Sequence, residues 1–263
     1  MKPKKHLGQN FLTSKKAVFE IIKAGDIQKD DFILEIGGGK GFLTEDLLKT
    51  TAKILVVEKD KELFLFLKQK FEEFIKNGKL ILINEDILLF DIKKTLKENN
   101  IKNYKIIANI PYYITGKILQ NFLSIKEKPS KMILLLQKEV ANRIVAKDEK
   151  ESILSLIISF YGEAKIIYKV SAGSFFPKPK VDSAVLQINI NNKNIDKDIE
   201  DLYIKLIKAA FSHKRKKMIS NLKQEFPKID FIKIFTALNI NINARSEELK
   251  KDIFIKMIDF LKI

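Results

Sequence analysis

Short, mainly apolar runs alternate regularly with helical stretches along the first two-thirds of the chain, and this pattern leaves few possible folds. Five such runs precede residue 140: 32–36, 54–57, 80–83, 105–108 and 132–136. Strands that are apolar on both faces are typical of a parallel sheet covered by helices on both sides. Helical patterns over 61–76 and 116–123 separate some of these runs, and residues 165–170 and 184–190 predict two further strands that could pair antiparallel at one edge. The predicted fold class is α/β, a doubly wound, Rossmann-like sheet.

The region after the last predicted strand has a different character. An Asn-rich stretch at 189–194 interrupts the pattern, and apolar residues then recur at helical spacing, as in Leu249, Ile253, Met257 and Leu261. Ser246 is a predicted N-cap for that helix. We therefore expect a sheet domain over residues 1–193 and a small all-helical domain over residues 194–263.

Charge and residue types restrict the chemistry. The chain of 263 residues carries a net charge of +16, which favours an anionic partner such as nucleic acid, although a compositional bias towards Lys would also contribute. Cysteine is absent and histidine occurs only at His6 and His213. Disulfides, thiolate nucleophiles and the usual Cys/His metal cages are thus excluded, and no metal is expected.

The sequence predicts neither a membrane span nor an export signal. No apolar run reaches the roughly 20 residues that a membrane span needs. The basic residues 1–6 are followed by Gly8-Gln9-Asn10, not by an apolar signal core. We expect a cytoplasmic protein with no membrane partner.

A cofactor site is predicted at the ends of the first three strands. Residues 37–41, Gly-Gly-Gly-Lys-Gly, form a strand-to-helix turn in which Gly37 and Gly39 allow close backbone approach to a ligand. Glu58 ends the second strand, where an acid can accept hydrogen bonds from ribose hydroxyls, and Asp86 follows the third. Each feature alone is also compatible with a ligand-free turn or a solvated acid. Together they indicate an adenosine-containing cofactor, which a dinucleotide-dependent dehydrogenase would equally use.

The residues Asn109-Ile110-Pro111-Tyr112 end the fourth strand, beside the expected cofactor. The lone pair of an adenine amine is delocalised into the ring, which makes it a poor nucleophile. Two acceptors directed at its hydrogens, the Asn109 side chain and the Ile110 carbonyl, would favour a pyramidal nitrogen. Pro111 restricts the turn, and Tyr112 offers a face on which a flipped base can stack. The pattern favours methylation of adenine from a sulfonium donor, with proximity and alignment supplying most of the rate.

Motifs along nearly the whole chain resemble one family. Asn-Ile-Pro-Tyr is similar to the Asn/Asp-Pro-Pro-Tyr motif of amino-directed methyltransferases. Five further segments resemble the small-subunit rRNA adenine dimethyltransferases of the KsgA/RsmA family. They are residues 5–12 (KHLGQNFL), 137–143 (QKEVANR), 175–184 (FFPKPKVDSA), 210–217 (AFSHKRKK) and 245–249 (RSEEL).

The resemblance implies roles for individual residues. S-adenosylmethionine would be the cofactor, contacted by Asn10, Leu12, Gly37, Gly39, Glu58, Asp86 and Asn109. The catalytic residues would be Asn109 together with Tyr112 and Phe175, whose rings would sandwich the target adenine. Tyr113 departs from the family, because many relatives carry Asn there, and so does Gly38, where others have Pro. The basic run 214–217 could grip phosphates or form an exposed helical face.

The expected function follows from this resemblance. The chain would dimethylate N6 of two adjacent adenines in the 3′-terminal hairpin of 16S rRNA, within an assembling small ribosomal subunit, as a monomer. One alternative is an Erm-type 23S rRNA adenine methyltransferase, which shares the fold and the Asn-Ile-Pro-Tyr core. Another is a non-catalytic RNA-binding assembly factor, and a dehydrogenase is the third.

Overall fold

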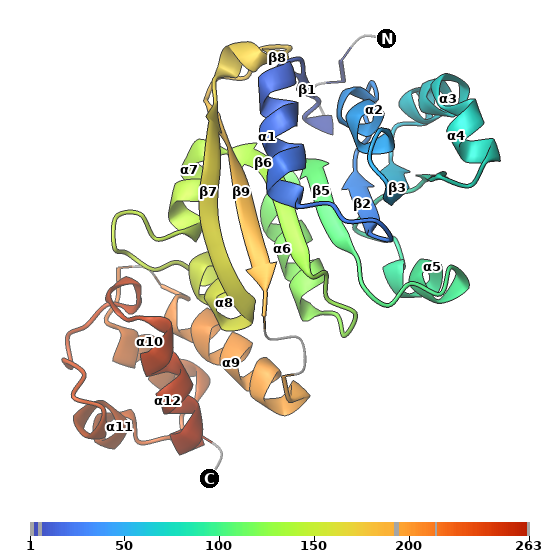
Figure 1. Ribbon diagram of the computed structural model, residues 1–263. Coiled ribbons are helices and arrows are strands. Elements are labelled where there is room, and N and C mark those ends of the chain that lie inside the picture. Colours follow the sequence, from blue (N-terminus) through green and yellow to red (C-terminus); the bar gives the residue numbers. More distant parts are fainter. Residues whose placement is uncertain (1–2, 5–6, 192–194, 214, 262–263) are drawn as a thin grey trace. The chain divides into compact units, whose positions relative to one another are not determined.

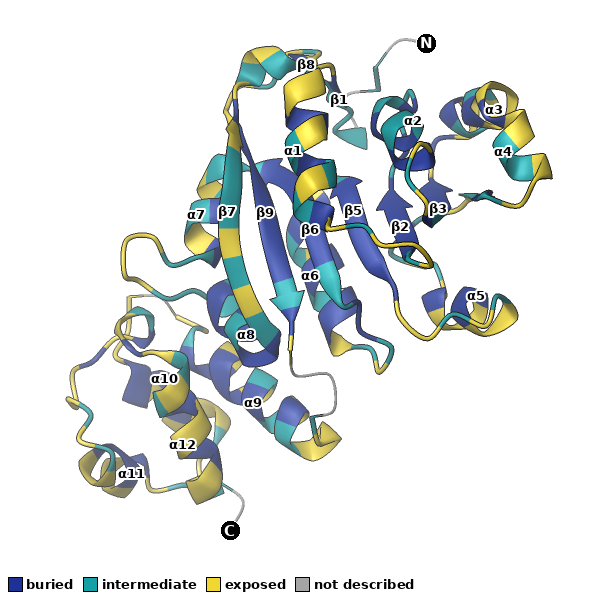
Figure 2. Cartoon of the chain, viewed as in Figure 1, coloured by how far each residue is buried: buried dark blue, intermediate teal, exposed yellow. Residues whose placement is uncertain are grey.

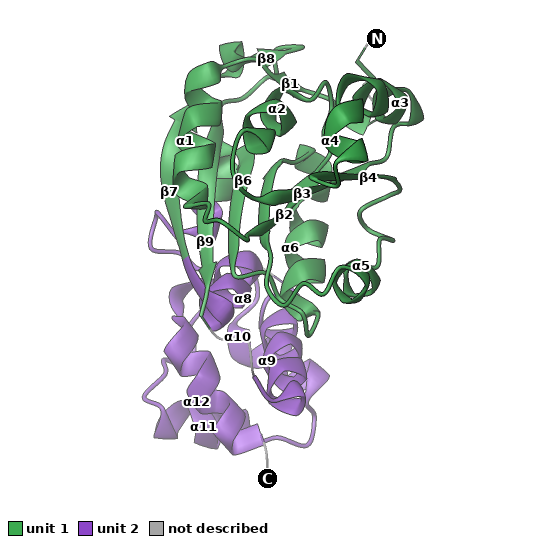
Figure 3. Cartoon of the chain, turned by 45° about the vertical axis from the view of Figure 1, so that its right-hand side comes forward, with its two compact units in different colours: residues 1–141, 164–191 green, residues 142–163, 192–263 purple. Residues whose placement is uncertain are grey.

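The chain folds into two compact units in the computed structural model, which describes residues 3–4, 7–191, 195–213 and 215–261 (Figure 1). Unit 1 comprises Met1–Ala141 and Ala164–Asn191, and unit 2 comprises Asn142–Glu163 and Asn192–Ile263 (Figure 3). Four parts of the motifs and connector noted above lie outside the described residues: Lys5, His6, the connector 192–194 and Lys214.

Unit 1 is built on a seven-stranded sheet with the order β4-β3-β2-β5-β6-β9-β7. Its strands are β2 (Phe32–Ile36), β3 (Lys53–Glu58), β4 (Leu80–Asn84), β5 (Lys105–Asn109), β6 (Lys131–Gln137), β7 (Gly162–Val170) and β9 (Ser183–Ile190). The first five pair in parallel, and β9 runs antiparallel to β6. The predicted α/β class is confirmed, and the two late strands lie together at one edge.

Helices cover both faces of the central strands of this sheet, which explains why these strands are mainly apolar. All five residues of β2 are buried, as are the five central residues of β6 (Figure 2). Helix α1 lies in front of the sheet and α6 behind it in Figure 1. The helices of this part of the chain are α1 (Lys15–Gly25), α2 (Phe42–Leu48), α3 (Lys61–Lys70), α4 (Glu72–Lys76), α5 (Ile92–Glu98), α6 (Thr115–Ser124) and α7 (Lys138–Ile144), at which the chain passes into unit 2. The helix expected over 61–76 is divided between α3 and α4, because the buried Phe71 interrupts it.

The strand order determines where a ligand can bind. Strand β2 pairs with β3 on one side and with β5 on the other, so the chain leaves β2 and β5 in opposite directions across the sheet. Such a reversal opens a crevice at the carboxyl ends of the strands. The glycine turn follows β2 and Asn-Ile-Pro-Tyr completes β5, so the topology brings the two motifs together.

A separate two-stranded sheet was not foreseen from the sequence. Strand β1 (Phe11–Leu12) pairs antiparallel with β8 (Phe175–Phe176), opposing Phe11 to Phe176 and Leu12 to Phe175. This pairing places the N-terminal motif beside the Phe-Phe-Pro segment. Two residues are too short for an alternation pattern, which is why no sequence signal reveals these strands.

Unit 2 is helical, with α8 (Ile153–Tyr161), α9 (Lys197–Ala210), α10 (Met218–Glu225), α11 (Phe231–Ala237) and α12 (Lys251–Leu261). The expected division after residue 193 differs from the two units in one segment, because α8 groups with the C-terminal helices. Tyr203 of α9 stacks on Phe160 with ring centroids 4.0 Å apart, and its hydroxyl donates to the Leu156 carbonyl. These buried contacts pack α8 against α9 within unit 2.

The predicted N-cap at Ser246 is wrong. Helix α12 begins at Lys251, and Ser246 starts a short 3₁₀ turn, Ser246–Glu248. Its buried hydroxyl donates to the Ala210 carbonyl over 2.6 Å, and residues 247–250 separate it from the first residue of α12, so it lies too far along the chain to cap that helix.

Candidate active site

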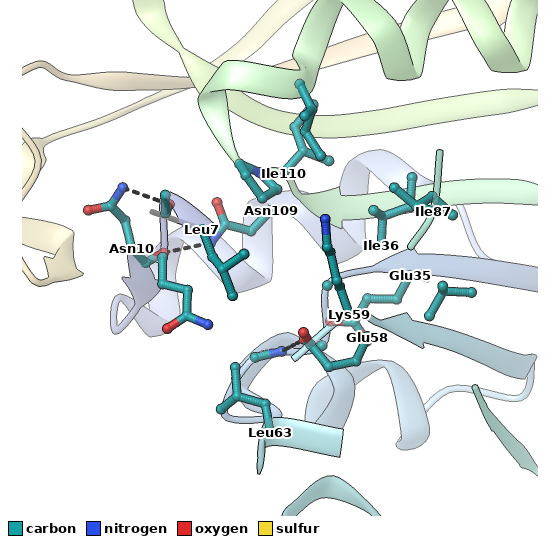
Figure 4. Close-up of a pocket in the computed structure, with 18 of the residues that line it drawn as sticks. Leu7, Asn10, Glu35, Ile36, Glu58, Lys59, Leu63, Ile87, Asn109 and Ile110 are labelled. Carbon is teal, nitrogen blue, oxygen red and sulfur yellow. Dashed lines mark hydrogen bonds between the residues drawn. The ribbon is translucent and has the colours of Figure 1, made fainter. Parts of the chain in front are cut away.

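An open cavity of about 240 Å³ lies at the carboxyl ends of β2 to β5 (Figure 4). Its wall is formed by the N-terminal segment 7–12, the glycine turn, the end of β3, the loop after β4 and the residues 109–114. The predicted site residues Asn10, Leu12, Gly37, Gly39, Glu58, Asp86, Asn109 and Tyr112 all line it. Phe175 does not.

The glycine turn presents bare backbone to the cavity. Gly37 has φ +74°, which favours glycine, and a Cβ placed there would meet nothing within 4 Å. The open side of Gly37 therefore faces space in which a ligand fits. Gly39, with φ +57°, donates its N–H to Glu58 Oε2 over 3.0 Å. This bond ties the turn after β2 to the end of β3.

Glu58 is buried, with its carboxylate held by backbone N–H groups. Oε2 accepts from Gly39 and Oε1 from Asp60 over 2.8 Å. Burial raises the pKa of Glu58, while these two hydrogen bonds oppose the rise. Each carboxylate oxygen can accept more than one hydrogen bond, so both retain capacity for ligand hydroxyls.

Asp86 is a half-buried acceptor in the loop after β4, the strand next to β3. Its Oδ2 pairs with the Lys59 ammonium over 2.8 Å, and its Oδ1 accepts from the Leu88 N–H over 3.0 Å. Burial by itself would raise the pKa of Asp86, but these partners outweigh it and the pKa is lowered. The group is thus an ionised acceptor at neutral pH.

Asn109 ends β5 with its side chain oriented by the N-terminal segment. Its Nδ2 donates to the Asn10 carbonyl over 3.0 Å, as drawn in Figure 4. Because the amide nitrogen is engaged, the amide oxygen is the group left to accept from a ligand. An amide held in this way can receive a hydrogen bond from an exocyclic amine.

Tyr112 begins the 3₁₀ turn Tyr112–Ile114 that follows Pro111. Its hydroxyl is 2.7 Å from Oγ of Ser183, which is fully buried in β9. This bond fixes the half-buried ring at the cavity wall. An aromatic face beside an oriented amide acceptor is suited to a planar base with an amine.

The comparisons with known proteins identify the family. The whole stretch 1–262 matches the family described as ribosomal RNA adenine dimethylase. The chain belongs to this family.

Relatives with the name ribosomal RNA small subunit methyltransferase A support this membership. The protein of Mycoplasma capricolum is 36% identical over 100% of this chain and 99% of its own length. That of Fusobacterium nucleatum is 38% identical, with 98% and 97% covered. A dimethyladenosine transferase structure from Plasmodium falciparum superposes with a TM-score of 0.78 at 22% identity, over 96% of this chain and 98% of that one. The structure of the 23S rRNA methyltransferase ErmE superposes with a TM-score of 0.75 at 20% identity, over 97% of this chain and 100% of that one. These two likenesses show the methyltransferase fold.

The position of Phe175 in this rRNA adenine dimethylase differs from the expected sandwich. Phe175 is only 4% exposed and packs in the hydrophobic core with Leu12. Successive side chains of a strand point to opposite faces, so β8 turns Phe175 inward and leaves Phe176 59% exposed. Of the two rings predicted to sandwich the adenine, only Tyr112 lines the cavity in this structure. The role of Phe175 stays a prediction.

Glu35 is a cavity residue that the sequence analysis missed. It lies in β2, is 1% exposed, and its Oε2 has no hydrogen-bond partner among the described residues. Burial raises its pKa to about 8, the neighbouring Thr44 hydroxyl opposes this rise, and the Glu58 charge adds to it. An acid within an otherwise apolar strand was the available sequence signal. Such an orphaned polar atom beside a cavity fits a ligand that carries its own polar groups.

The N-terminal segment of the dimethylase is held over the cavity by polar contacts. Lys4 Nζ and Gln9 Nε2 each lie 2.9 Å from the Asp60 carboxylate, at the start of α3. Gly8, with φ +61°, lies against the ring of Tyr113, 58% of which is exposed. Tyr113 is one of the positions that depart from the family, and here it serves as the surface on which the N-terminal segment rests.

The described residues also show what the structure lacks. None of the helices in that part of the dimethylase has the length and apolarity to cross a membrane. Likewise, no cluster of three or more His, Cys, Asp or Glu side chains capable of holding a metal ion occurs within it.

Proposed function

We propose that this chain transfers methyl groups from S-adenosylmethionine to N6 of two adjacent adenines in the 3′-terminal hairpin of 16S rRNA. Four transfers would produce two N6,N6-dimethyladenosines. The observation that carries the proposal is the Asn109 amide, held by the Asn10 carbonyl at the cavity wall beside the Tyr112 ring. The names of the relatives, small subunit methyltransferase A, favour the small-subunit substrate.

The cavity residues fit an S-adenosylmethionine molecule. The open side of Gly37 leaves room for it, Glu58 would accept from its ribose hydroxyls, and Asp86 would accept from its adenine amine. Leu12 and Asn10 would close over it from the N-terminal segment. When bound, this cofactor supplies a methyl group on a sulfonium centre, so the leaving group departs neutral.

The protein's own residues would prepare the target amine. The amide oxygen of Asn109 and the Ile110 carbonyl would each accept a hydrogen bond from the target amine. This arrangement favours a pyramidal nitrogen with its lone pair directed at the methyl group. Tyr112, fixed through Ser183, would stack on the base and hold it in line. Extrusion of the adenine from its stack costs a few kcal/mol, which an unpaired loop nucleotide reduces.

The net charge of +16 supports a large RNA partner, and we propose that the substrate is an assembling small ribosomal subunit bound by a monomer in the cytoplasm. Charge attracts the RNA without selecting a sequence. Selection of adenine would fall to the cavity, in which an amine must meet two acceptors.

A methylation assay tests the proposal. Small and large ribosomal subunits isolated without the modification would each be incubated with the protein and methyl-labelled S-adenosylmethionine, the labelled positions in 16S and 23S rRNA would be mapped, and the RNA would be digested to nucleosides. We expect N6,N6-dimethyladenosine at two adjacent positions of 16S rRNA. Label confined to 23S rRNA would instead support the Erm-type alternative. Tight subunit binding without any label would support a non-catalytic assembly factor. Tight nicotinamide binding without binding of S-adenosylmethionine would support a dehydrogenase.

A further inference from the structure

Three side chains outside the proposed methyl-transfer chemistry meet at the rim of the cavity. The Lys40 ammonium lies 5.1 Å from the ring centroid of Phe11 and 5.9 Å from that of Phe176. Phe11 and Phe176 are directly opposed in the β1–β8 pair, so their side chains share one face of that small sheet. We call Phe11, Lys40 and Phe176 the rim platform.

The rim platform joins the cavity wall to the outer surface. Phe11 and Lys40 line the cavity, whereas Phe176 lies beyond its lining and is 59% exposed. The ring of Phe11 packs against Gly39, where an added Cβ would lie 3.2 Å from its Cδ1. The inner end of the platform is therefore fixed to the glycine turn, and the outer end faces solvent.

The Lys40 ammonium is available to an anion. No carboxylate among the described residues lies within 4.0 Å of it, in contrast to Lys59 and Lys70 nearby, which are paired with Asp86 and Glu45. A lysine held over two rings, without an acid, combines a positive charge with aromatic faces. This is the combination with which proteins hold unpaired nucleotides: bases stack on the rings and phosphates meet the cation.

We propose that the rim platform binds the nucleotide next to the target adenosine, with its base stacked on Phe176 and its phosphate at Lys40. The inference rests on the proposed function, in which two adjacent adenines react. While one adenine occupies the cavity, its neighbour must lie just outside, and the platform extends outward from the cavity wall. The platform thereby positions the strand so that either adenine of the pair can enter.

Fluorescence of a labelled RNA tests this inference without relying on methyl transfer. The probe is an RNA hairpin with two adjacent adenosines in its loop and 2-aminopurine on the 5′ or the 3′ side of them, in two separate molecules. Stacking on Phe176 quenches 2-aminopurine. We expect quenching by the wild-type protein for at least one probe, its loss with Phe176→Ala, and its return with Phe176→Tyr.

Binding measurements with the same hairpins complete the test. Phe176→Ala should weaken RNA binding roughly tenfold, and Lys40→Gln should lower the slope of log affinity against log salt by about one. The affinity for S-adenosylhomocysteine should stay unchanged in Phe176→Ala. The matched control is Phe19→Ala, which removes another exposed ring, on α1.

The outcomes separate the platform from the proposed function. Equal quenching and equal affinity for Phe176→Ala and Phe19→Ala would overturn the platform, even while the wild type dimethylates 16S rRNA. A wild-type protein that methylates no adenine but shows Phe176-dependent quenching would overturn the proposed function and leave the platform as an RNA-binding site.

Discussion

The Asn109 amide donates a hydrogen bond to the Asn10 carbonyl over 3.0 Å, across 99 residues of sequence. This contact joins the end of β5 to the segment that covers the cavity. It leaves the amide oxygen of Asn109 as the acceptor and makes its orientation depend on the position of the N-terminal segment. Closure of that segment and preparation of the amine acceptor are therefore coupled through one bond.

Replacement of Asn109 should abolish methyl transfer while the fold persists. Asn109→Ala removes an oriented acceptor, and we expect kcat to fall about 100-fold or more, in line with the loss of a single polar group that stabilises a transition state. Single-turnover methylation of small subunits measures this. Asn121→Ala, in an exposed position on α6, is the control. Near-normal activity of Asn109→Ala would refute the assigned role.

Two changes at Tyr112 should separate its ring from its hydroxyl. Tyr112→Phe keeps the stacking face but leaves the buried Ser183 hydroxyl without its partner, which should lower the free energy of unfolding by about 1–3 kcal/mol. Tyr112→Ala also removes the ring and should reduce kcat/KM for subunits by a further factor of about 10. Chemical denaturation and steady-state kinetics measure the two effects. Ser183→Ala leaves the ring of Tyr112 in place, so its stability and activity should resemble those of Tyr112→Phe. If Ser183→Ala lost as much activity as Tyr112→Ala, the separate roles of ring and hydroxyl would be contradicted.

The contact of Gly8 with Tyr113 should control cofactor affinity. Gly8→Ala puts a Cβ about 3.0 Å from Tyr113 Cδ1 at φ +61°, so the N-terminal segment would have to shift from the cavity. We expect S-adenosylhomocysteine to bind about tenfold more weakly, by titration calorimetry. Adding Tyr113→Ala should restore part of this loss, because it relieves the steric clash but not the backbone strain. Equal affinities in the wild type and Gly8→Ala would show that this contact does not support the site.

The buried Glu35 should make stability depend on pH. Its pKa is raised from 4.5 to about 8, so between these values the folded state retains a proton that the unfolded state loses. The contribution of Glu35 to stability is full below about pH 4.5 and is lost as the pH rises to about 8. Glu35→Gln removes this titration. As the pH rises from about 4.5 to about 8, the free energy of unfolding of Glu35→Gln should therefore increase by a few kcal/mol relative to that of the wild type. Denaturation of the ligand-free protein at several pH values measures this. The exposed Glu73→Gln is the control, and a constant difference between Glu35→Gln and wild type would be the contrary result.

Much of the sheet and part of the site could be predicted because their signals are local. The five mainly apolar runs correspond to β2, β3, β5 and β6, which are buried almost throughout, and to the less buried β4. The glycine turn, Glu58, Asp86 and Asn109 follow strand ends directly, so parallel topology is enough to bring them to one edge. The structure places all of them on one cavity.

The remainder depended on contacts between distant segments. Glu35 could not be recognised as a cavity residue, because its position in an apolar strand does not show which neighbours surround its carboxylate. Ser246 has the residue type and spacing of an N-cap, yet its hydroxyl donates to the Ala210 carbonyl and the helix begins only at Lys251. Each such choice is decided by partners that are remote in sequence.

The α/β class, the family and the motifs that end the strands followed from the sequence alone, because periodicity and residue type act over a few positions. Contacts between distant segments were needed to assign which of the two identical rings, Phe175 or Phe176, faces outward and which partner orients Asn109. The physical reason is that two successive phenylalanines in a strand are equivalent until pairing with β1 assigns one of them to the core. In the same way, an amide has no preferred direction until a carbonyl from another part of the chain engages its nitrogen.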